Sequence, residues 1–208
     1  MSEYFIPAGS GETEFVEKRS SFLGHVRFVE TEDAAREFIN EIKKKHYDAR
    51  HNCWCYIIRG GAVRYSDDGE PQGTAGLPML EVFKREGVEN VVCVVTRYFG
   101  GVLLGTGGLL RAYTKSAKDA LNAAGIAVVR RWVRVSVECP YSLLERIKLE
   151  CTALDGTVRD TQYGAQVALE LLLPEKNAET FAARVTEISA GACTAELTGE
   201  ELMPVKLR

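Results

Sequence analysis

The stretch VVCVVTRYFGGVLLGTGGLLRAYTKSAKDALNAAG, residues 91–125, decides the fold of this chain. It begins with an apolar run of valines and one cysteine, the composition of a strand that is covered on both faces. A glycine-rich loop then leads into a helix expected from about Gly108 to Ala124, whose apolar side chains recur at helical spacing. Gly125 is expected to end this helix. The strand and the helix indicate the first of two domains of mixed α and β structure.

Further elements are expected before this stretch. The pattern predicts strands at residues 14–18, 22–29, 52–59 and 62–65, a helix that follows Thr31, and a helix from about residue 77 to 86. Thr31 is a favourable N-cap, and acids in the first turn and Lys43–His46 in the last turn follow the helix dipole. Helix chemistry therefore explains the lysine run.

The texture of the sequence changes after Arg131. Apolar and polar residues alternate from Val133 to Glu138, which is typical of a half-buried strand. A helix, two strands, a helix and a last strand are expected to follow. This β-α-β-β-α-β order in about 75 residues is that of a ferredoxin-like split unit. We therefore expect two domains, residues 1–131 and residues 132–208.

Composition places the 208 residues, with a net charge of −3, among ordinary soluble globular proteins. No apolar run approaches the ~18 residues of a membrane span, and the N-terminus shows no secretory signal. We therefore expect a cytoplasmic protein whose six cysteines are reduced thiols. Residues 1–131 hold 18 basic and 17 acidic residues, whereas residues 132–208 hold 8 and 12. A phosphate-contacting surface should therefore lie in the first part.

Two glycine-rich loops, residues 66–76 and 97–108, offer many backbone amides but no nucleophile beside a base. Because glycine accumulates where something must come close to the backbone, they favour a binding surface over a reaction centre. Amides at a helix start and nearby cations suit phosphate, although a basic helix stripe is also typical of a solvated face. The candidate residues for phosphate or nucleic acid are Gly73, Thr74, Arg97, Gly100, Gly101, Gly105, Gly107, Gly108, Arg111, Lys115 and Lys118. No catalytic residue, cofactor or metal is assigned.

Nucleotide motifs fit the second loop poorly. It lacks the lysine and the hydroxyl of a Walker loop, and it has Leu110 where a dinucleotide fingerprint needs glycine or alanine. A looser similarity remains to the phosphate loop of small-molecule kinases of the homoserine and mevalonate type.

Two clusters invite a metal interpretation. Asp67, Asp68 and Glu70 are three carboxylates that either hold Mg²⁺ or Ca²⁺ or form a turn by bonding their own backbone. Cys53 and Cys55 face the same side of a strand, but no second ligand pair at zinc spacing exists. No orienting group can be named for a thiol nucleophile either.

Three motifs of the first domain occur together. They are His51-x-Cys53 at the start of a strand, the run from Ser66 to Pro78, and the run from Val95 to Tyr113. On these residues the chain resembles the IMPACT family of conserved cytoplasmic proteins, in its bacterial, YigZ-like branch. The second and third motifs are long and specific. Residues 132–208 resemble the small domain of that branch by architecture more than by motif.

The resemblance implies a fold and a class of binding partner. It implies an α/β sandwich similar to the second domain of a small-subunit ribosomal protein and to domain four of elongation factor G. It also implies a ferredoxin-like domain similar to domain five of that factor. The mammalian relative competes for the large activator of the starvation-responsive kinase through an extra N-terminal module, for which we expect no room here. An association with ribosomes or structured RNA, without an established enzymatic activity, is what the resemblance implies.

Three functional hypotheses remain open. The first is a non-enzymatic binding protein that associates with RNA or the ribosome through the first domain, with modulation of translation as a consequence. The second is an enzyme that holds a phosphorylated small molecule or nucleotide between the glycine loops. The third is an adaptor that binds a protein through the acidic second domain.

Overall fold

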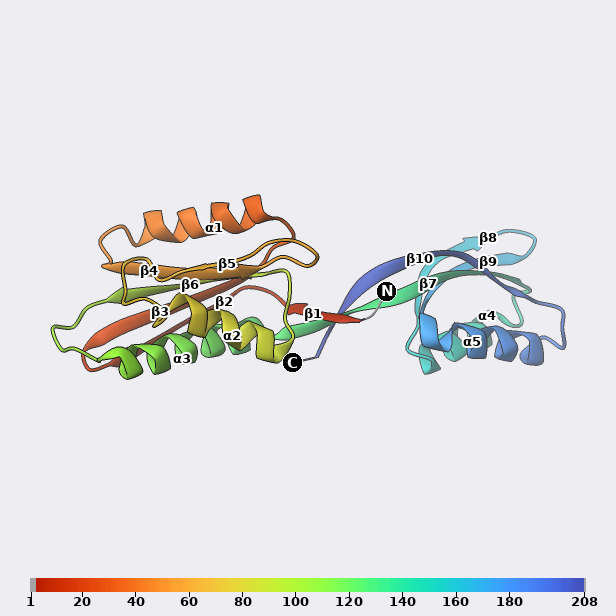
Figure 1. Cartoon of the computed structure of the whole chain (residues 1–208). Helices are drawn as coiled ribbons and strands as arrows, with labels where there is room; N and C mark the ends of the chain where they lie inside the picture. The colour runs from red at the N-terminus through yellow and green to blue at the C-terminus, as the bar shows by residue number, and fades with distance from the viewer. Residues whose placement is uncertain (1–2, 208) are drawn as a thin grey trace. The chain divides into compact units, whose positions relative to one another are not determined.

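The computed structural model describes residues 3–207, which form two units. The first domain comprises residues 4–128 and 204–207, and the second comprises Glu3 and residues 129–203. Both units mix helices and strands, so the expected two-domain α+β architecture is confirmed (Figure 1). The boundary, expected after Arg131, falls three residues earlier and inside a continuous strand.

The first domain is built on a five-stranded sheet in the order β2-β3-β6-β4-β5, in which neighbouring strands are antiparallel. Its elements are β1 (Tyr4–Pro7), β2 (Gly11–Glu17), β3 (Ser20–Phe28), α1 (Glu32–Lys45), β4 (His51–Ile57), β5 (Val63–Ser66), α2 (Gly76–Glu86), β6 (Val91–Tyr98) and α3 (Thr106–Ala124). Strand β1 was not expected from the sequence, and α3 begins two residues before the expected start.

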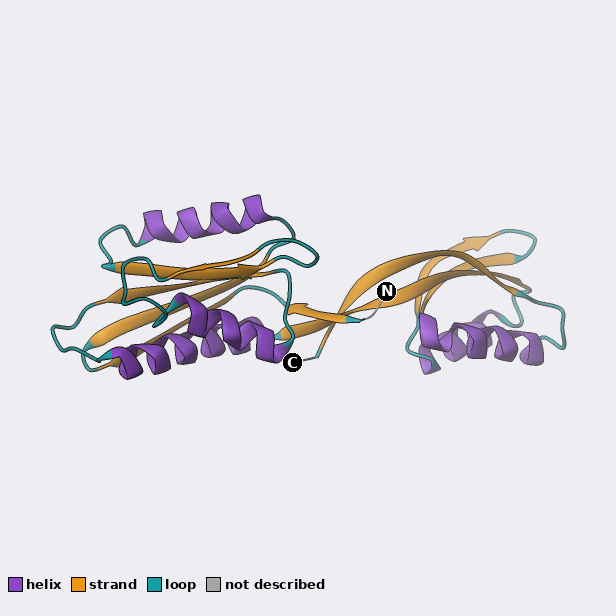
Figure 2. Cartoon of the chain, viewed as in Figure 1, coloured by secondary structure: helices purple, strands orange, loops and turns teal. Residues whose placement is uncertain are grey.

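Helices cover both faces of this sheet (Figure 2). Successive side chains of β6 point to opposite faces, so Cys93 and Val95 pack with α2 and α3, whereas Val92 and Val94 pack with α1. All four are fully buried. The expectation of a strand covered on both faces is therefore confirmed.

Local chemistry sets the ends of these helices as expected. The hydroxyl of Thr31 accepts a hydrogen bond from the amide of Ala34 and caps α1. Gly87, in the left-handed conformation, ends α2, and Gly125 ends α3.

The second domain has the element order predicted from the sequence. Its elements are β7 (Ile126–Cys139, of which the first three residues belong to the first domain), α4 (Leu144–Ala153), β8 (Thr157–Tyr163), β9 (Val167–Pro174), α5 (Glu175–Ile188) and β10 (Ala195–Lys206). The strands follow the order β10-β7-β9-β8, which is that of a ferredoxin-like split unit. Side chains of both helices pack with β7 and β9, as Ile147 and Phe181 do, to form one core.

A buried pair of histidines lies between β3 and α1. His25 is 3% exposed, and the ring centres of His25 and His46 lie 5.5 Å apart. Burial lowers the pKa of both imidazoles and Lys45 lowers it further, although Glu12 acts in the opposite direction. The fold therefore favours the neutral form of both side chains.

This pair makes stability depend on pH. An unfolded histidine has a pKa of about 6.5, so the unfolded state binds more protons as the pH falls below that value. We expect the free energy of unfolding to decrease from about pH 7 to about pH 5, and His25→Gln to make this decrease shallower. Urea unfolding at pH 5, 6 and 7 measures the slope. An identical slope in His25→Gln would show that His25 does not contribute.

Candidate functional site

One carboxylate organises the turn between β5 and α2. Asp67 accepts hydrogen bonds of 2.8–3.0 Å from three backbone amides, those of Gly73, Ala75 and Gly76. The amide of Thr74 donates instead to the carbonyl of Pro71, at 3.1 Å. The expectation that Gly73 and Thr74 offer unpaired amides to an external anion is therefore wrong, because the turn satisfies them itself.

The three acids of this turn do not assemble into a cation site. Asp67 is occupied by the amides, and Asp68 accepts from the amide of Asn52 and the ammonium of Lys43, both at 2.7 Å. Glu70 turns away toward other partners. Among residues 3–207 no group of three or more histidine, cysteine or acidic side chains is arranged to hold a metal ion. The cation interpretation is therefore wrong, and turn formation explains Asp67.

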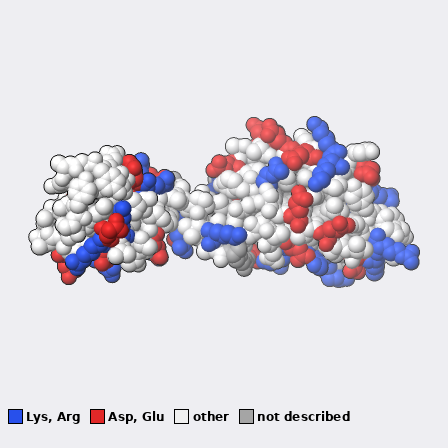
Figure 3. Space-filling view, turned by 180° about the vertical axis from the view of Figure 1, so that it is seen from behind, with Lys and Arg blue, Asp and Glu red and all other residues white. Residues whose placement is uncertain are grey.

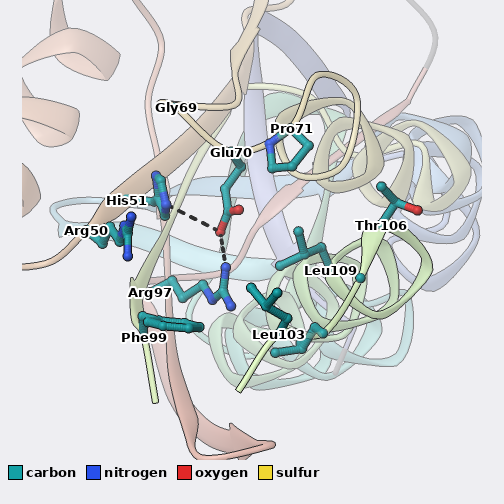
Figure 4. Close-up of a pocket in the computed structure, with 12 residues that line it drawn as sticks. Arg50, His51, Gly69, Glu70, Pro71, Arg97, Phe99, Leu103, Thr106 and Leu109 are labelled. Carbon is teal, nitrogen blue, oxygen red and sulfur yellow. Dashed lines mark hydrogen bonds and ion pairs between the residues drawn. The ribbon is translucent and has the colours of Figure 1, made fainter. Parts of the chain in front are cut away.

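Glu70 is the buried centre of a polar cluster (Figure 4). Its Oε1 lies 2.7 Å from the guanidinium of Arg97 and accepts a hydrogen bond of 2.8 Å from the hydroxyl of Tyr113. Nε2 of His51 lies 3.9 Å from the same oxygen. Burial raises the pKa of Tyr113, so its phenol stays protonated and donates. The charge of Arg97 is thus matched inside the domain.

Helix α3 begins without a side-chain cap. Its N-cap is Gly105, at φ 73° and ψ 166°, a conformation that is nearly restricted to glycine. A Cβ at this position would meet no described atom within 4 Å. The space beside Gly105 is therefore open, and this end of the 19-residue helix carries the positive partial charge of the helix dipole. This is the helix start that the sequence analysis proposed for phosphate.

The loop before α3 is held against the turn between β2 and β3. A Cβ on Gly100 would lie 1.9 Å from the carbonyl oxygen of Arg19. The amide of Gly100 donates to the hydroxyl of Ser20 at 3.2 Å. Glycine is needed here for close approach, not for an external anion. Gly108 likewise permits contact with Leu104, because its Cβ would lie 2.9 Å from that side chain.

A cavity of about 360 Å³ opens at the start of α3, and we call it the α3 pocket. It has the size of a small-ligand site. Its polar and charged lining comes from the residue before β4, from β4, the turn at residues 67–70, β6 and α3, and consists of Arg50, His51, Glu70, Arg97 and Thr106. Figure 4 shows Arg50, His51 and Arg97 grouped around Glu70 and Phe99.

The cations of the α3 pocket have donors to spare. Nε of the buried Arg97 has no hydrogen-bond partner among residues 3–207. Arg50 is exposed and forms no ion pair with a carboxylate in the same range. The guanidinium carbons of Arg50 and Arg97 lie 5.6 and 5.4 Å from the ring centre of Phe99. The partly exposed ring and its two guanidinium groups form a stacking surface beside an anion-compatible helix end.

The basic stripe on α3 is largely neutralised. Lys115 pairs with Asp119, and Lys118 pairs with Glu86. Arg111 forms no ion pair within residues 3–207 and lines a separate hollow of about 230 Å³ with Lys18 and other residues. On the side shown in Figure 3, basic and acidic residues are interspersed. The pairing of Lys115 and Lys118 is typical of a solvated helix face, one of the two alternatives that the sequence left open for this stripe.

The cysteines of β4 are structural. The thiol of Cys53 donates to the carbonyl of Asp67, at 2.9 Å, and burial raises the pKa of both Cys53 and Cys55. A raised thiol pKa disfavours the thiolate that a nucleophile or a zinc ligand requires. His51 serves the acidic turn instead, because its Nδ1 lies 2.9 Å from the carbonyl oxygen of Asp68.

The structure gathers only part of the predicted set. Arg97 and Gly105 line the α3 pocket, whereas Gly73, Thr74, Lys115 and Lys118 do not. Sequence reasoning missed Arg50, which follows α1 in an irregular segment without a motif. His51 lies directly opposite Arg97 in the register of β4 and β6, a signal that strand pairing alone could have revealed.

Comparisons with known proteins agree with this two-part organisation. The model of the Impact N-terminal domain matches residues 18–121, and that of a domain of unknown function, DUF1949, matches residues 137–192. Among residues 3–207, no helix combines the length and the apolar character needed to cross a membrane.

Several relatives are similar over nearly the full chain. The IMPACT family member YvyE of Bacillus subtilis is 40% identical over 92% of this chain and 89% of its own length. YigZ of Escherichia coli is 33% identical over 92% and 96%. A crystal structure described as that of a hypothetical protein is 32% identical, covers 94% of this chain and 97% of its own, and superposes with a TM-score of 0.60.

Proposed function

Because the chain belongs to the IMPACT family, we propose that it is a non-enzymatic binding protein whose α3 pocket holds a phosphate group of RNA. One observation carries the proposal: an uncapped helix start opens into a cavity with two guanidinium groups and a partly exposed aromatic ring. Helix amides and arginine would bind the phosphate, and Phe99 would stack on a base.

The partners of Glu70 support binding rather than bond breaking. Arg97 and Tyr113 both contact the same carboxylate oxygen, so Glu70 acts as the internal anchor of the pocket. The raised pKa of Tyr113 keeps the phenol from acting as a base near neutral pH. Arg50 and the helix start remain to contact a ligand.

Ribosomal RNA, within the ribosome, is the first RNA to test. From the family resemblance, we propose that the two domains are built like domains four and five of elongation factor G. A protein of that build that binds RNA phosphate would act in the cytoplasm and influence translation.

Arg50→Glu should weaken binding to ribosomes and to transfer RNA by about tenfold at low salt, because it places a negative charge in the α3 pocket. The slope of log affinity against log salt should also become shallower by about one unit or more. Co-sedimentation with ribosomes and fluorescence anisotropy with labelled transfer RNA measure both quantities over a series of salt concentrations.

The matched control is Arg146→Glu, which makes the same charge change at an exposed position of the second domain. It should alter affinity by less than about twofold. Binding that does not respond to salt, an equal effect of the two variants, or no binding to either RNA would refute the proposal.

A further inference from the structure

A second cavity, of about 460 Å³, lies in the first domain between α1 and the edge strand β5. We call it the α1–β5 groove. It lies on the sheet face that α1 covers, opposite the face covered by α2 and α3. Its charged and aromatic lining consists of Arg36, Lys43, Trp54, Tyr56 and Arg64.

Two aromatic rings form the floor of this groove. Trp54 and Tyr56 are two residues apart on β4 and therefore face the same side of the sheet. Their ring centres lie 5.6 Å apart and their planes differ by 6°, so the rings are stacked. Tyr56 is buried, whereas Trp54 is partly exposed and offers indole surface to the groove.

Three cations surround this floor. Arg36 and Lys43 are seven residues apart on α1, two helical turns along one face, and they pair with Glu32 and Asp68. Arg64 stands directly opposite Tyr56 in the register of β4 and β5. Its guanidinium donates to the carbonyl of Val63 at 3.1 Å and forms no ion pair among residues 3–207. Arg64 thus keeps guanidinium donors for a ligand.

Residues of the groove and of the α3 pocket contact the same turn, residues 67–70. Lys43 of the groove binds Asp68, and the next residues of the turn, Gly69 and Glu70, line the α3 pocket. His51, also in that pocket, contacts the carbonyl of Asp68. The acidic turn therefore contacts residues of both cavities, which lie on opposite faces of the sheet.

We propose that the α1–β5 groove holds one nucleotide of single-stranded RNA, with the base on Trp54 and the phosphate against Arg64. This rests on the proposed function and adds a second site to it. Base stacking on an aromatic ring tolerates every base and gains from flanking cations. An acidic peptide would use the cations but leave the aromatic floor without a planar partner.

The test uses the fluorescence of Trp54 in full-length protein. Trp132→Phe removes the other tryptophan, and this background is titrated with an RNA of eight adenosines, with AMP and with a heptaglutamate peptide. Stacking of a base on the indole should quench the fluorescence to saturation with the RNA. Arg64→Glu should weaken the RNA affinity by about tenfold, whereas Lys44→Glu, the same charge change at an exposed position of α1 outside the groove lining, should weaken it by less than about twofold.

A third variant separates this proposal from the proposed function. Arg50→Glu should lower the affinity for RNA but leave the quenching of Trp54 at saturation. RNA binding without quenching, or an equal effect of Arg64→Glu and Lys44→Glu, would overturn the proposal for the groove. The proposal for the α3 pocket would not be affected. Quenching by AMP at concentrations similar to those of the RNA would assign the groove to free nucleotides, and quenching by heptaglutamate alone would assign it to acidic peptides. Either result overturns the RNA proposal.

Discussion

Glu70→Ala is expected to lower the free energy of unfolding by about 3–5 kcal/mol, the cost of breaking a buried ion pair from one side. Arg97 is 5% exposed and would keep its charge without the carboxylate that lies 2.7 Å away. The hydroxyl of Tyr113 would also lose its acceptor. Urea unfolding followed by circular dichroism measures the change.

Two controls distinguish this pair from an ordinary surface charge. Glu81→Ala removes the exposed partner of Lys84 and should cost less than about 1 kcal/mol. The double variant Glu70→Leu with Arg97→Met removes both charges, so it should lose much less stability than the two single losses added together. Additive losses would show that the two side chains act independently.

Asp67→Ala should destabilise the first domain by about 2–4 kcal/mol, since each orphaned buried donor costs roughly 1–3 kcal/mol and water can reach some of the three. The amides of Gly73, Ala75 and Gly76 lose their common acceptor. The start of α2 should loosen, because Gly76 is its first residue. Thermal and urea unfolding measure the loss.

Asp33→Ala is the matched control for this variant. Asp33 is exposed in the first turn of α1, where a carboxylate contributes about 0.3–1 kcal/mol through the helix dipole. If Asp67→Ala cost no more than this control, the amides of the turn would not depend on Asp67.

Much of the fold could be predicted because local chemistry and burial agree. Thr31 caps α1, Gly87 and Gly125 end their helices, and the valine run of β6 is buried on both faces. Strand β1 has no such pattern. The alternation of apolar and polar residues from Val133 predicted the later part of β7. The strand begins at Ile126, in a run of buried residues directly after α3, and that run shows no alternation.

The candidate site was harder to predict because the hydrogen-bond and ion-pair partners of its residues are distant in sequence. Gly73 and Gly105 both lie in glycine-rich loops, and the sequence does not distinguish them. In the structure the amide of Gly73 donates to Asp67, whereas the space beside Gly105 is open. The sequence marked Arg97 as a candidate site residue, but it did not reveal the pairing with Glu70, which lies 27 residues away along the chain. Arg50 carries no motif and becomes a candidate only through its position beside Phe99.

The contact between Arg97 and Glu70 has a consequence for any visiting phosphate. Arg97 already has a counter-ion in the carboxylate of Glu70. An external phosphate would have to compete with this carboxylate, which is part of the chain and cannot diffuse away. If the proposed phosphate contact forms, this competition should make it weak, and salt should weaken it further. A surface of this kind suits brief, repeated encounters rather than permanent residence.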